Sequence, residues 1–326
     1  MTDPVRPPFD PELAAALSVI NENVPSSLTP EMVPQIRRQR AEALRTQVPA
    51  DLTLEGAFTE ESHTAPGPGG APEVPLIVWR PTAGSSPTGA LYWIHGGGMM
   101  LGTHRGEEIP LLLETARELG AALVSVDYRL APENPHPAPV EDCYAGLVWV
   151  VENAEKLGVD PGRVVVGGAS AGGGLAAATA LLARDRGGPD LIGQLLLYPM
   201  LDDRNDTCSS HQMAGTGVWD RVSNDTGWGA LLGEAAGGPD VSPYAAPARS
   251  EDLSGLPPAF LDVGSAETFR DEVVEFASRL WKAGGSAELH VWPGGFHGFD
   301  GFAPQAALSR SAAAQRLPWL RRIMGV

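Results

Sequence analysis

Short apolar runs alternate with longer amphipathic segments over most of this chain. The apolar runs predict strands over 90–95, 122–128, 163–168, 191–199, 258–264 and 287–293. Helices are predicted between most of them, over 107–119, 141–157, 171–184 and 270–283. Because apolar strands that alternate with helices form parallel sheets buried on both faces, the pattern indicates an α/β protein.

The region before residue 90 adds two helices and two strands. Apolar periodicity predicts helices over 13–20 and 36–44, and the alternation of Leu52, Leu54 and Phe58 predicts a strand. A second strand is expected over 74–80, with loops over 63–72 and 81–89. We therefore expect an eight-stranded, mostly parallel sheet with helices on both faces.

Residues 202–250 interrupt this alternation. They contain no convincing strand, only helical pieces broken by Gly and Pro, with Trp219 and Trp228 among them. A connection of this length between two strands is best explained as an insertion that packs over one edge of the sheet. The helical N-terminus is placed to join it there.

Composition limits the kinds of partner and compartment. The 326 residues are 43% hydrophobic and carry a formal net charge of −17, which fits a globular chain and disfavours nucleic acids or anionic membranes as partners. Two cysteines, Cys143 and Cys208, suit reduced thiols better than a disulfide framework. No signal-peptide pattern is seen, and the longest weakly polar stretch, 174–183, is about half of a membrane span. We expect a soluble cytoplasmic protein.

The most informative motif is GASAG, residues 168–172. It follows a predicted strand and opens a predicted helix, which is the context of a nucleophile elbow. In such a turn the serine, here Ser170, is held in a strained conformation at the carboxyl end of the sheet, and small neighbours avoid clashes. The alternative is a small-residue turn that only allows the helix and the strand to pack together.

A second motif, HGGG at 95–98, follows the strand over 90–95. Consecutive glycines weaken local structure, so their presence indicates a need for exposed backbone. Acyl transfer requires N–H donors directed at the oxygen that becomes negative. We assign the amides of Gly96, Gly97 and Ala171 to such an oxyanion hole. A phosphate-binding loop is the alternative, although the lysine of that motif is missing.

A serine nucleophile needs a base and an acid that holds the base. Of the seven histidines, His297 follows the last predicted strand in a glycine-rich loop at the carboxyl end of the sheet, and it is the preferred base. Three carboxylates compete for the role of the acid. Asp262 lies within a strand, Asp271 has the spacing of a helix cap and is kept in reserve, and Glu267 follows the strand directly. We favour Glu267, which gives the order serine, acid, histidine that is typical of α/β hydrolases.

These motifs resemble those of the bacterial hormone-sensitive-lipase-like esterases of the α/β-hydrolase superfamily. The likeness extends from about residue 75 to the end and rests on HGGG (95–98), DYRLAPENPHPAPVED (127–142), GGASAGGGLA (167–176), GSAETFRDE (264–272) and GGFHGF (294–299). It implies that Ser170 is the nucleophile, that His297 is the histidine, and that the oxyanion amides belong to Gly96, Gly97 and Ala171.

The resemblance also implies a helical cap and so a division into four parts. These are N-terminal cap helices over 1–50, a first part of the hydrolase core over 51–201, a cap insertion over 202–250 and a second part of the core over 251–326. The sequence departs from the family at Ala169, where Asp or Thr is usual, and at Glu267, where Asp is usual. Met99 and Met100 stand where an aromatic residue is common, either as an apolar pocket wall or as core filling.

Two further groups of residues have structural and functional interpretations. We interpret Arg129, Glu133 and Asp142 as an ion-pair and turn network that braces the HGGG loop, rather than as a polar site. Met213, with Trp219 and Trp228, fits either a substrate entrance or the small core of an inserted cap.

The resulting hypothesis is a serine carboxylesterase that acts through an acyl-enzyme on esters with short to medium acyl chains, as the resemblance implies. It needs no cofactor and no metal. A non-catalytic receptor for a small ligand on the same fold is one alternative, and an amidase or lactone hydrolase with the same site is another. A homodimer is suggested by the resemblance alone.

Overall fold

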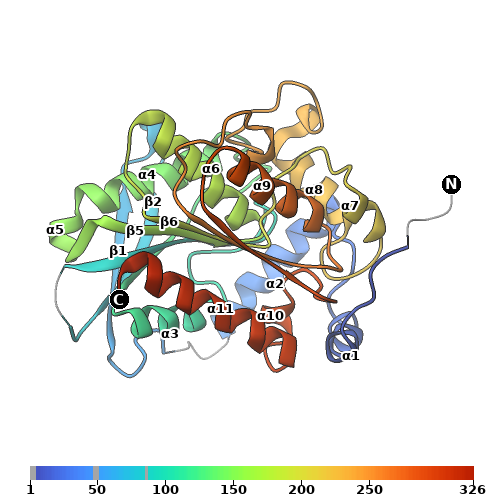
Figure 1. Ribbon diagram of the computed structural model, residues 1–326, viewed down its shortest axis with the longest axis horizontal. Coiled ribbons are helices and arrows are strands. Elements are labelled where there is room, and N and C mark those ends of the chain that lie inside the picture. The colour runs from blue at the N-terminus through green and yellow to red at the C-terminus, as the bar shows by residue number, and fades with distance from the viewer. Residues whose placement is uncertain (1–4, 47–50, 85–86) are drawn as a thin grey trace.

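The strands of the protein form one sheet (Figure 1). A computed structural model describes residues 5–46, 51–84 and 87–326. Its strands are β1 (Phe58–Ala65), β2 (Val74–Pro81), β3 (Thr88–Ile94), β4 (Ala122–Val126), β5 (Val159–Ala169), β6 (Gly193–Leu197), β7 (Ala259–Gly264) and β8 (Ala287–Trp292). The six strands predicted from apolar runs are all present, with bounds that differ by a few residues.

The sheet has eight strands in the order β1-β2-β4-β3-β5-β6-β7-β8. β2 pairs with β1 and with β4 in antiparallel register, and every other neighbouring pair is parallel. Every residue of β4 and of β6 is buried, which explains why these strands are apolar on both faces. The predicted α/β architecture with an eight-stranded, mostly parallel sheet is confirmed.

Helices cover both faces of this sheet. They are α1 (Pro11–Ile20), α2 (Val33–Thr46), α3 (Ile109–Leu119), α4 (Ala138–Glu152), α5 (Ala154–Leu157), α6 (Ala171–Arg186), α7 (Cys208–Gln212), α8 (Arg221–Leu232), α9 (Arg270–Lys282), α10 (Phe299–Phe302) and α11 (Ala307–Met324). In Figure 1, α4, α6 and α9 lie on one side of the strands, and α3 and α11 lie on the other. The central strands therefore lie between two helical layers.

The prediction of a strand at Leu52 and Leu54 is wrong. The chain turns there, with positive φ at Leu54 (48°) and Glu55 (57°). The carboxylate of Asp51 accepts hydrogen bonds from the amides of Thr53 and Glu55 and so closes the turn. β1 begins only at Phe58 and continues into the segment that was expected to be a loop.

Helix α11 was not among the expected elements. Pro318 lies inside it, and an internal proline usually argues against a helix. Burial of one face compensates, because Trp319, Leu320 and Met324 are all at most 4% exposed. The predicted helix over 141–157 is divided into α4 and α5.

The segment between α1 and α2 forms hydrogen bonds with residues at the start of α8, which is distant in the sequence. The hydroxyl of Ser27 donates to the Asp220 carboxylate (2.8 Å), and the amide of Leu28 donates to the Ser223 hydroxyl (2.8 Å). The Thr226 hydroxyl donates to the carbonyl of Leu28 (2.8 Å). The N-terminal segment and residues 202–250 are thus in direct contact. The predicted part boundary after residue 50 falls at 47–50, outside the described residues.

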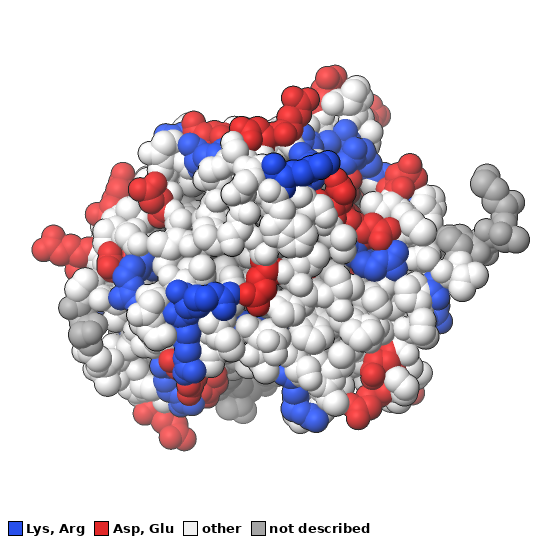
Figure 2. Space-filling view, in the orientation of Figure 1, with Lys and Arg blue, Asp and Glu red and all other residues white. Residues whose placement is uncertain are grey.

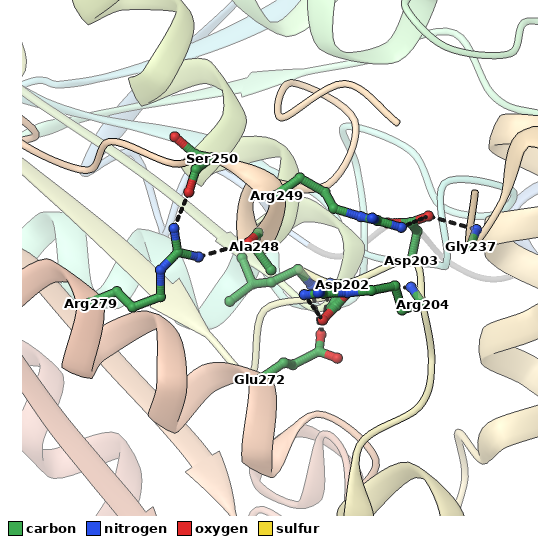
Figure 3. A network of polar contacts seen from close by, with 10 residues as sticks. Asp202, Asp203, Arg204, Gly237, Ala248, Arg249, Ser250, Glu272 and Arg279 are labelled. Atoms are coloured by element: carbon green, nitrogen blue, oxygen red, sulfur yellow. Dashed lines mark hydrogen bonds and ion pairs between the residues drawn. The ribbon is translucent and has the colours of Figure 1, made fainter. Parts of the chain in front are cut away.

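A buried polar network joins the two ends of residues 202–250 (Figure 3). The carboxylate of Asp203, fully buried, accepts from Arg249 (2.7 and 3.0 Å) and from the amide of Gly237 (2.7 Å). On α9, the carboxylate of Glu272 accepts from the amides of Leu201 (2.7 Å) and Asp202 (3.3 Å). The start of the segment is therefore fixed to its end, through Asp203 and Arg249, and to the core helix α9, through Glu272.

Charges of both signs are interspersed on the face shown in Figure 2. Several exposed arginines have acidic partners, as in the pairs Arg321–Glu118 (2.9 Å) and Arg322–Glu288 (2.5 Å). Cys143 is buried and Cys208 is exposed, and each is a free thiol. In the described part of the chain, no helix combines the length and the apolar character needed to cross a bilayer.

Candidate active site

Ser170 occupies a strained turn between β5 and α6. Its φ and ψ are 58° and −124°, outside the regions that L-residues ordinarily adopt, which costs about 1–3 kcal/mol. A Cβ atom at Gly168 would lie 2.2 Å from the carbonyl oxygen of Gly172, and one at Gly172 would lie 2.0 Å from that of Ile94. The glycines of the motif are therefore required by close backbone contacts on both sides of the serine.

Ser170, His297 and Glu267 form a continuous hydrogen-bonded chain. The distance from Ser170 Oγ to His297 Nε2 is 2.9 Å, and the distance from His297 Nδ1 to Glu267 Oε1 is 3.2 Å. With a carboxylate facing Nδ1, this nitrogen carries the proton and Nε2 accepts from the serine hydroxyl. Glu267 is held in turn by the amide of Gly264, which donates to Oε2 at 3.1 Å. The three side chains are nearly closed to solvent.

The other two carboxylates of this region are occupied elsewhere. Asp271 accepts from the amide of Ser209 (2.8 Å) and from Arg270 (2.8 Å). Asp262 is buried on β7 and pairs with Arg316 (2.9 Å). Of the three candidates for the acid, the structure brings only Glu267 into contact with His297.

Three aromatic rings surround the imidazole of His297. Tyr198 and Phe269 meet it edge to face, with centroids at 5.1 and 5.0 Å. The Trp219 centroid lies at 6.4 Å. These contacts fix the ring plane, so the imidazole has little freedom to turn away from Ser170.

The HGGG loop lies beside the serine. A Cβ atom at Gly96 would lie 2.8 Å from the carbonyl oxygen of Ala169 and 3.4 Å from the Cβ of Ser170. The φ of Gly97 is 112°, a value that disfavours any other residue. Within the described residues, no group accepts a hydrogen bond from the amides of Gly96, Gly97 or Ala171. These donors are thus available to a ligand at Ser170.

Two aromatic side chains hold the first part of this loop. The imidazole of His95 stacks on the ring of Tyr128, with centroids 4.2 Å apart, and its Nδ1 contacts the carbonyl oxygen of Gly96 at 2.9 Å. The hydroxyl of Tyr128 donates to the carbonyl of His95 (2.9 Å). Burial lowers the pKa of His95 to about 4, so the imidazole is neutral near pH 7 and Nδ1 acts as the donor.

The expected bracing network has different members. Arg129 and Asp142 form a bidentate pair (2.8 Å for each bond), as interpreted from the sequence. Glu133 instead pairs with Arg37 of α2 (2.7 Å). Arg37 also donates to two backbone carbonyls that belong to or contact the HGGG loop, those of Met100 (2.7 Å) and Ala131 (2.5 Å). Sequence reasoning missed Arg37, because backbone acceptors leave no pattern in the side chains.

A buried charge cluster lies behind the acid and the histidine. Arg316 of α11 contacts Asp262 (2.9 Å) on β7 and Asp300 (2.6 Å) on α10. Burial raises the pKa of Asp262 to about 6, and the positive charge of Arg316 opposes that rise. Arg316 therefore links the strand that precedes Glu267 to the helix that follows His297.

The remaining candidates are divided between the site and the core. Trp219 lies against the site, whereas Trp228 and Met213 are each 1% exposed. Met99 and Met100 are also buried and belong to the main apolar core, which fits core filling rather than a pocket wall. Over residues 5–46, 51–84 and 87–326, no cluster of three or more His, Cys, Asp or Glu side chains is arranged to hold a metal ion.

Comparisons with known proteins identify similar sequences and structures. A family model described as the α/β-hydrolase fold matches residues 91–301. The carboxylesterase NlhH of Mycobacterium tuberculosis is 36% identical over 335 residues, which is 99% of each chain. Among solved structures, a bacterial heroin esterase aligns with a TM-score of 0.88 and 42% identity over 99% of each chain. Esterase LipW from Mycobacterium marinum aligns with a TM-score of 0.83 and 34% identity over 98% of each chain.

The fold, the motifs and these relatives lead to one family. The relatives are named as esterases or carboxylesterases and match nearly the full length of the chain. The chain belongs to the α/β-hydrolase family, among its bacterial hormone-sensitive-lipase-like carboxylesterases, and is a carboxylic ester hydrolase.

Proposed function

We propose that this enzyme hydrolyses carboxylic esters with short to medium acyl chains through an acyl-enzyme. Ser170 is the nucleophile, His297 the general base and Glu267 the acid that orients it. The amides of Gly96, Gly97 and Ala171 form the oxyanion hole. The observation that carries the proposal is the pair of contacts that His297 makes, at 2.9 Å to the serine and 3.2 Å to the glutamate.

In the first half of the reaction, Ser170 Oγ attacks the ester carbonyl while His297 Nε2 takes the hydroxyl proton. The carbonyl oxygen becomes negative and accepts from the three free amides, which lowers the barrier by electrostatic preorganisation. The imidazolium is stabilised by the carboxylate of Glu267. His297 then returns its proton to the leaving alcohol oxygen as the carbon–oxygen bond of the ester breaks.

In the second half, water attacks the acyl group on Ser170. His297 takes a proton from this water, and the tetrahedral intermediate again uses the oxyanion amides. Collapse of the intermediate returns the proton to Ser170 Oγ and releases the carboxylic acid. The strained φ of Ser170 supports this role, because strain of this kind is retained where a nucleophile must project beyond the carboxyl end of the sheet.

The N-terminal helices and residues 202–250 are proposed to form a cap over this site. The bonds of Ser27 and Leu28 to the start of α8 support a joint unit. A homodimer in the cytoplasm is the assembly and compartment that the family resemblance and the free thiols favour. Light scattering of the purified enzyme tests the dimer by its mass.

The test compares the variants Ser170→Ala and Ser125→Ala on p-nitrophenyl acetate and butyrate. Ser125 is the matched control, since its hydroxyl is buried in β4 and has no partner among the described residues. Loss of the nucleophile should reduce kcat by about a thousandfold or more, and the control should keep most of the activity. Turnover by Ser170→Ala at the parental rate would refute the mechanism.

Labelling with a fluorophosphonate separates the enzyme from a receptor on the same fold. An activated serine should react stoichiometrically, and Ser170→Ala should not be labelled. A chain that binds small ligands without an activated serine would remain unlabelled. Comparison of an ester with its matching amide distinguishes an esterase from an amidase.

A further inference from the structure

A second apolar core lies around the chain on either side of His297. Phe296 and Phe299 are each at most 1% exposed, and they are buried in a cluster that is separate from the main core of the sheet. The buried members of this second core are Leu13, Leu17, Val218, Phe296, Phe299, Ala303, Ala306 and Ala312. The backbone that carries the imidazole is therefore packed by side chains from outside the sheet.

Helix α1 contributes one face to this second core. Leu13 is 0% exposed, and Leu17, one turn later, is 5% exposed. Just before the helix, the ring of Phe9 meets that of Phe296 edge to face, with centroids 6.3 Å apart. In Figure 1, α1 accordingly lies beside α10, the short helix that follows His297. The N-terminal helix is thus packed against the loop of the general base.

The backbone of this loop is also bonded to the start of α1. The amide of Asp10 donates to the carbonyl of Gly294 (3.1 Å), and a Cβ atom at Gly294 would overlap the amide nitrogen of Asp10. The amide of Gly294 in turn donates to Ser265 Oγ (2.8 Å), which belongs to the loop of the acid. The loop of His297 is therefore held between α1 and the loop of the acid.

The first turn of α1 is fixed by its own side chains. The carboxylate of Asp10 is the N-cap and accepts from the amides of Glu12 (2.9 Å) and Leu13 (3.2 Å). The carboxylate of Glu12 accepts from the amide of Ala307 (2.7 Å), the first residue of α11. These bonds set the position of Leu13 relative to the two helices that follow the general base.

The ring and the backbone of His297 are held by different cores. Tyr198 and Phe269, which meet the imidazole edge to face, belong to the main core and restrict rotation of the ring. Phe296 and Phe299 belong to the second core and restrict displacement of the backbone. Because a displacement of about 1 Å at a reacting group can reduce a rate about a hundredfold, the second core bears directly on catalysis.

We propose that α1 is a positioning element for the general base and that Leu13 is its principal positioning residue. Through the second core, Leu13 keeps Phe296 and Phe299 in place, and these keep His297 at hydrogen-bond distance from Ser170. This inference rests on the proposed function. It gives α1 a role in the rate of proton transfer and not in the choice of ester.

The test compares Leu13→Ala with Leu13→Met and Leu113→Ala. Leu113 is the matched control, since it is also 0% exposed but lies on α3 in the main core. On p-nitrophenyl acetate and butyrate, Leu13→Ala should lower kcat about tenfold and leave KM within about twofold, because the base is displaced. Leu13→Met keeps the volume of the side chain, so its kcat should stay within about twofold of the wild type. The control should do the same.

Titration to completion with a fluorophosphonate gives the concentration of intact sites, and kcat per site is then independent of partial unfolding. The rate of labelling is a second measurement, since it requires the proton transfer from Ser170 but no bound ester. It should also fall about tenfold in Leu13→Ala. If that variant does not fold, Phe9→Leu decides the question, because Phe9 is only half-buried and contacts Phe296. It should lower both rates at least about threefold.

Unchanged rates per site in Leu13→Ala would overturn the inference. Equal losses in Leu113→Ala would also overturn it, since any loosened core would then have the same effect. A higher KM at an unchanged kcat would assign α1 to ester binding and contradict a positioning role. A wild type that is neither labelled nor active on these esters would instead refute the proposed function.

Discussion

The buried imidazole of His95 makes the stability of this enzyme depend on pH. His95 follows β3 directly and is 1% exposed, with one face on the ring of Tyr128. Its Nδ1 donates a hydrogen bond to the carbonyl oxygen of Gly96 (2.9 Å), and no described group is a hydrogen-bond partner of its Nε2. A proton added to Nε2 would therefore place a charge in a site with no acceptor for it.

The size of the effect follows from the pKa. Burial lowers the pKa of His95 from 6.5 in the unfolded chain to about 4 in the folded protein. The folded state binds the proton less well, so this contribution to stability is complete above pH 6.5 and is lost as the pH falls toward 4. The full contribution is about 3 kcal/mol, of which about 2 kcal/mol should already be lost at pH 5.

The perturbation is His95→Asn, which removes the titrating ring and retains an N–H donor for the carbonyl of Gly96. Urea denaturation at pH 7.5 and pH 5 gives the free energy of unfolding for both proteins. Between these two values, the wild type should lose about 2 kcal/mol more than the variant, beyond what the remaining groups contribute to both.

A matched exchange at the surface controls for the loss of a histidine. His211 is exposed and pairs with Asp206, and His211→Asn should retain the wild-type loss of stability at acid pH. Equal losses in the wild type and in His95→Asn would show that His95 is not a source of the acid sensitivity. The reasoning from burial would then be wrong for this residue.

Two further predictions concern Arg37, which contacts the HGGG loop, and Arg316, which pairs with two buried carboxylates. Arg37→Ala removes two hydrogen bonds to carbonyls that fix the HGGG loop and should lower kcat on p-nitrophenyl acetate about tenfold, whereas Glu133→Gln, which removes only an exposed partner, should change it less than twofold. Equal effects of the two exchanges would count against a bracing role. Arg316→Met leaves the buried carboxylates of Asp262 and Asp300 without a cation and should cost about 3–5 kcal/mol of unfolding free energy. Denaturation at pH 7.5 measures this cost, and a change below about 1 kcal/mol would contradict it.

The central sheet was predictable because its strands carry a strong local signal. The inner strands of the sheet, such as β4 and β6, are buried on both faces, so they are mostly apolar and stand out from the helices between them. The turn over 52–57 was not recognised, since its apolar residues at 52 and 54 alternate as they would in a strand. Its conformation depends on hydrogen bonds to Asp51, which periodicity does not report.

The site residues were predictable to different degrees. Ser170 with Gly168 and Gly172 lies in one contiguous motif, and Gly96 with Gly97 lies in another, because the geometry of each group comes from a single turn. Glu267 and Asp271 are four positions apart in the same segment, and spacing alone left both open. The contact of Glu267 with His297 and with the amide of Gly264 separates them. Arg316 had no signal at all, since its partners are 54 and 16 positions away and it lies in a helix that was not expected.

The backbone contact between Gly172 and Ile94 has a consequence for laboratory evolution of this scaffold. The helix that follows the nucleophile rests against the main chain of β3, with no room for even a methyl group. Random mutagenesis of these two elements will therefore yield mostly inactive clones. Libraries directed at α8 leave that backbone contact intact, so a larger fraction of their clones should retain the turn that presents Ser170.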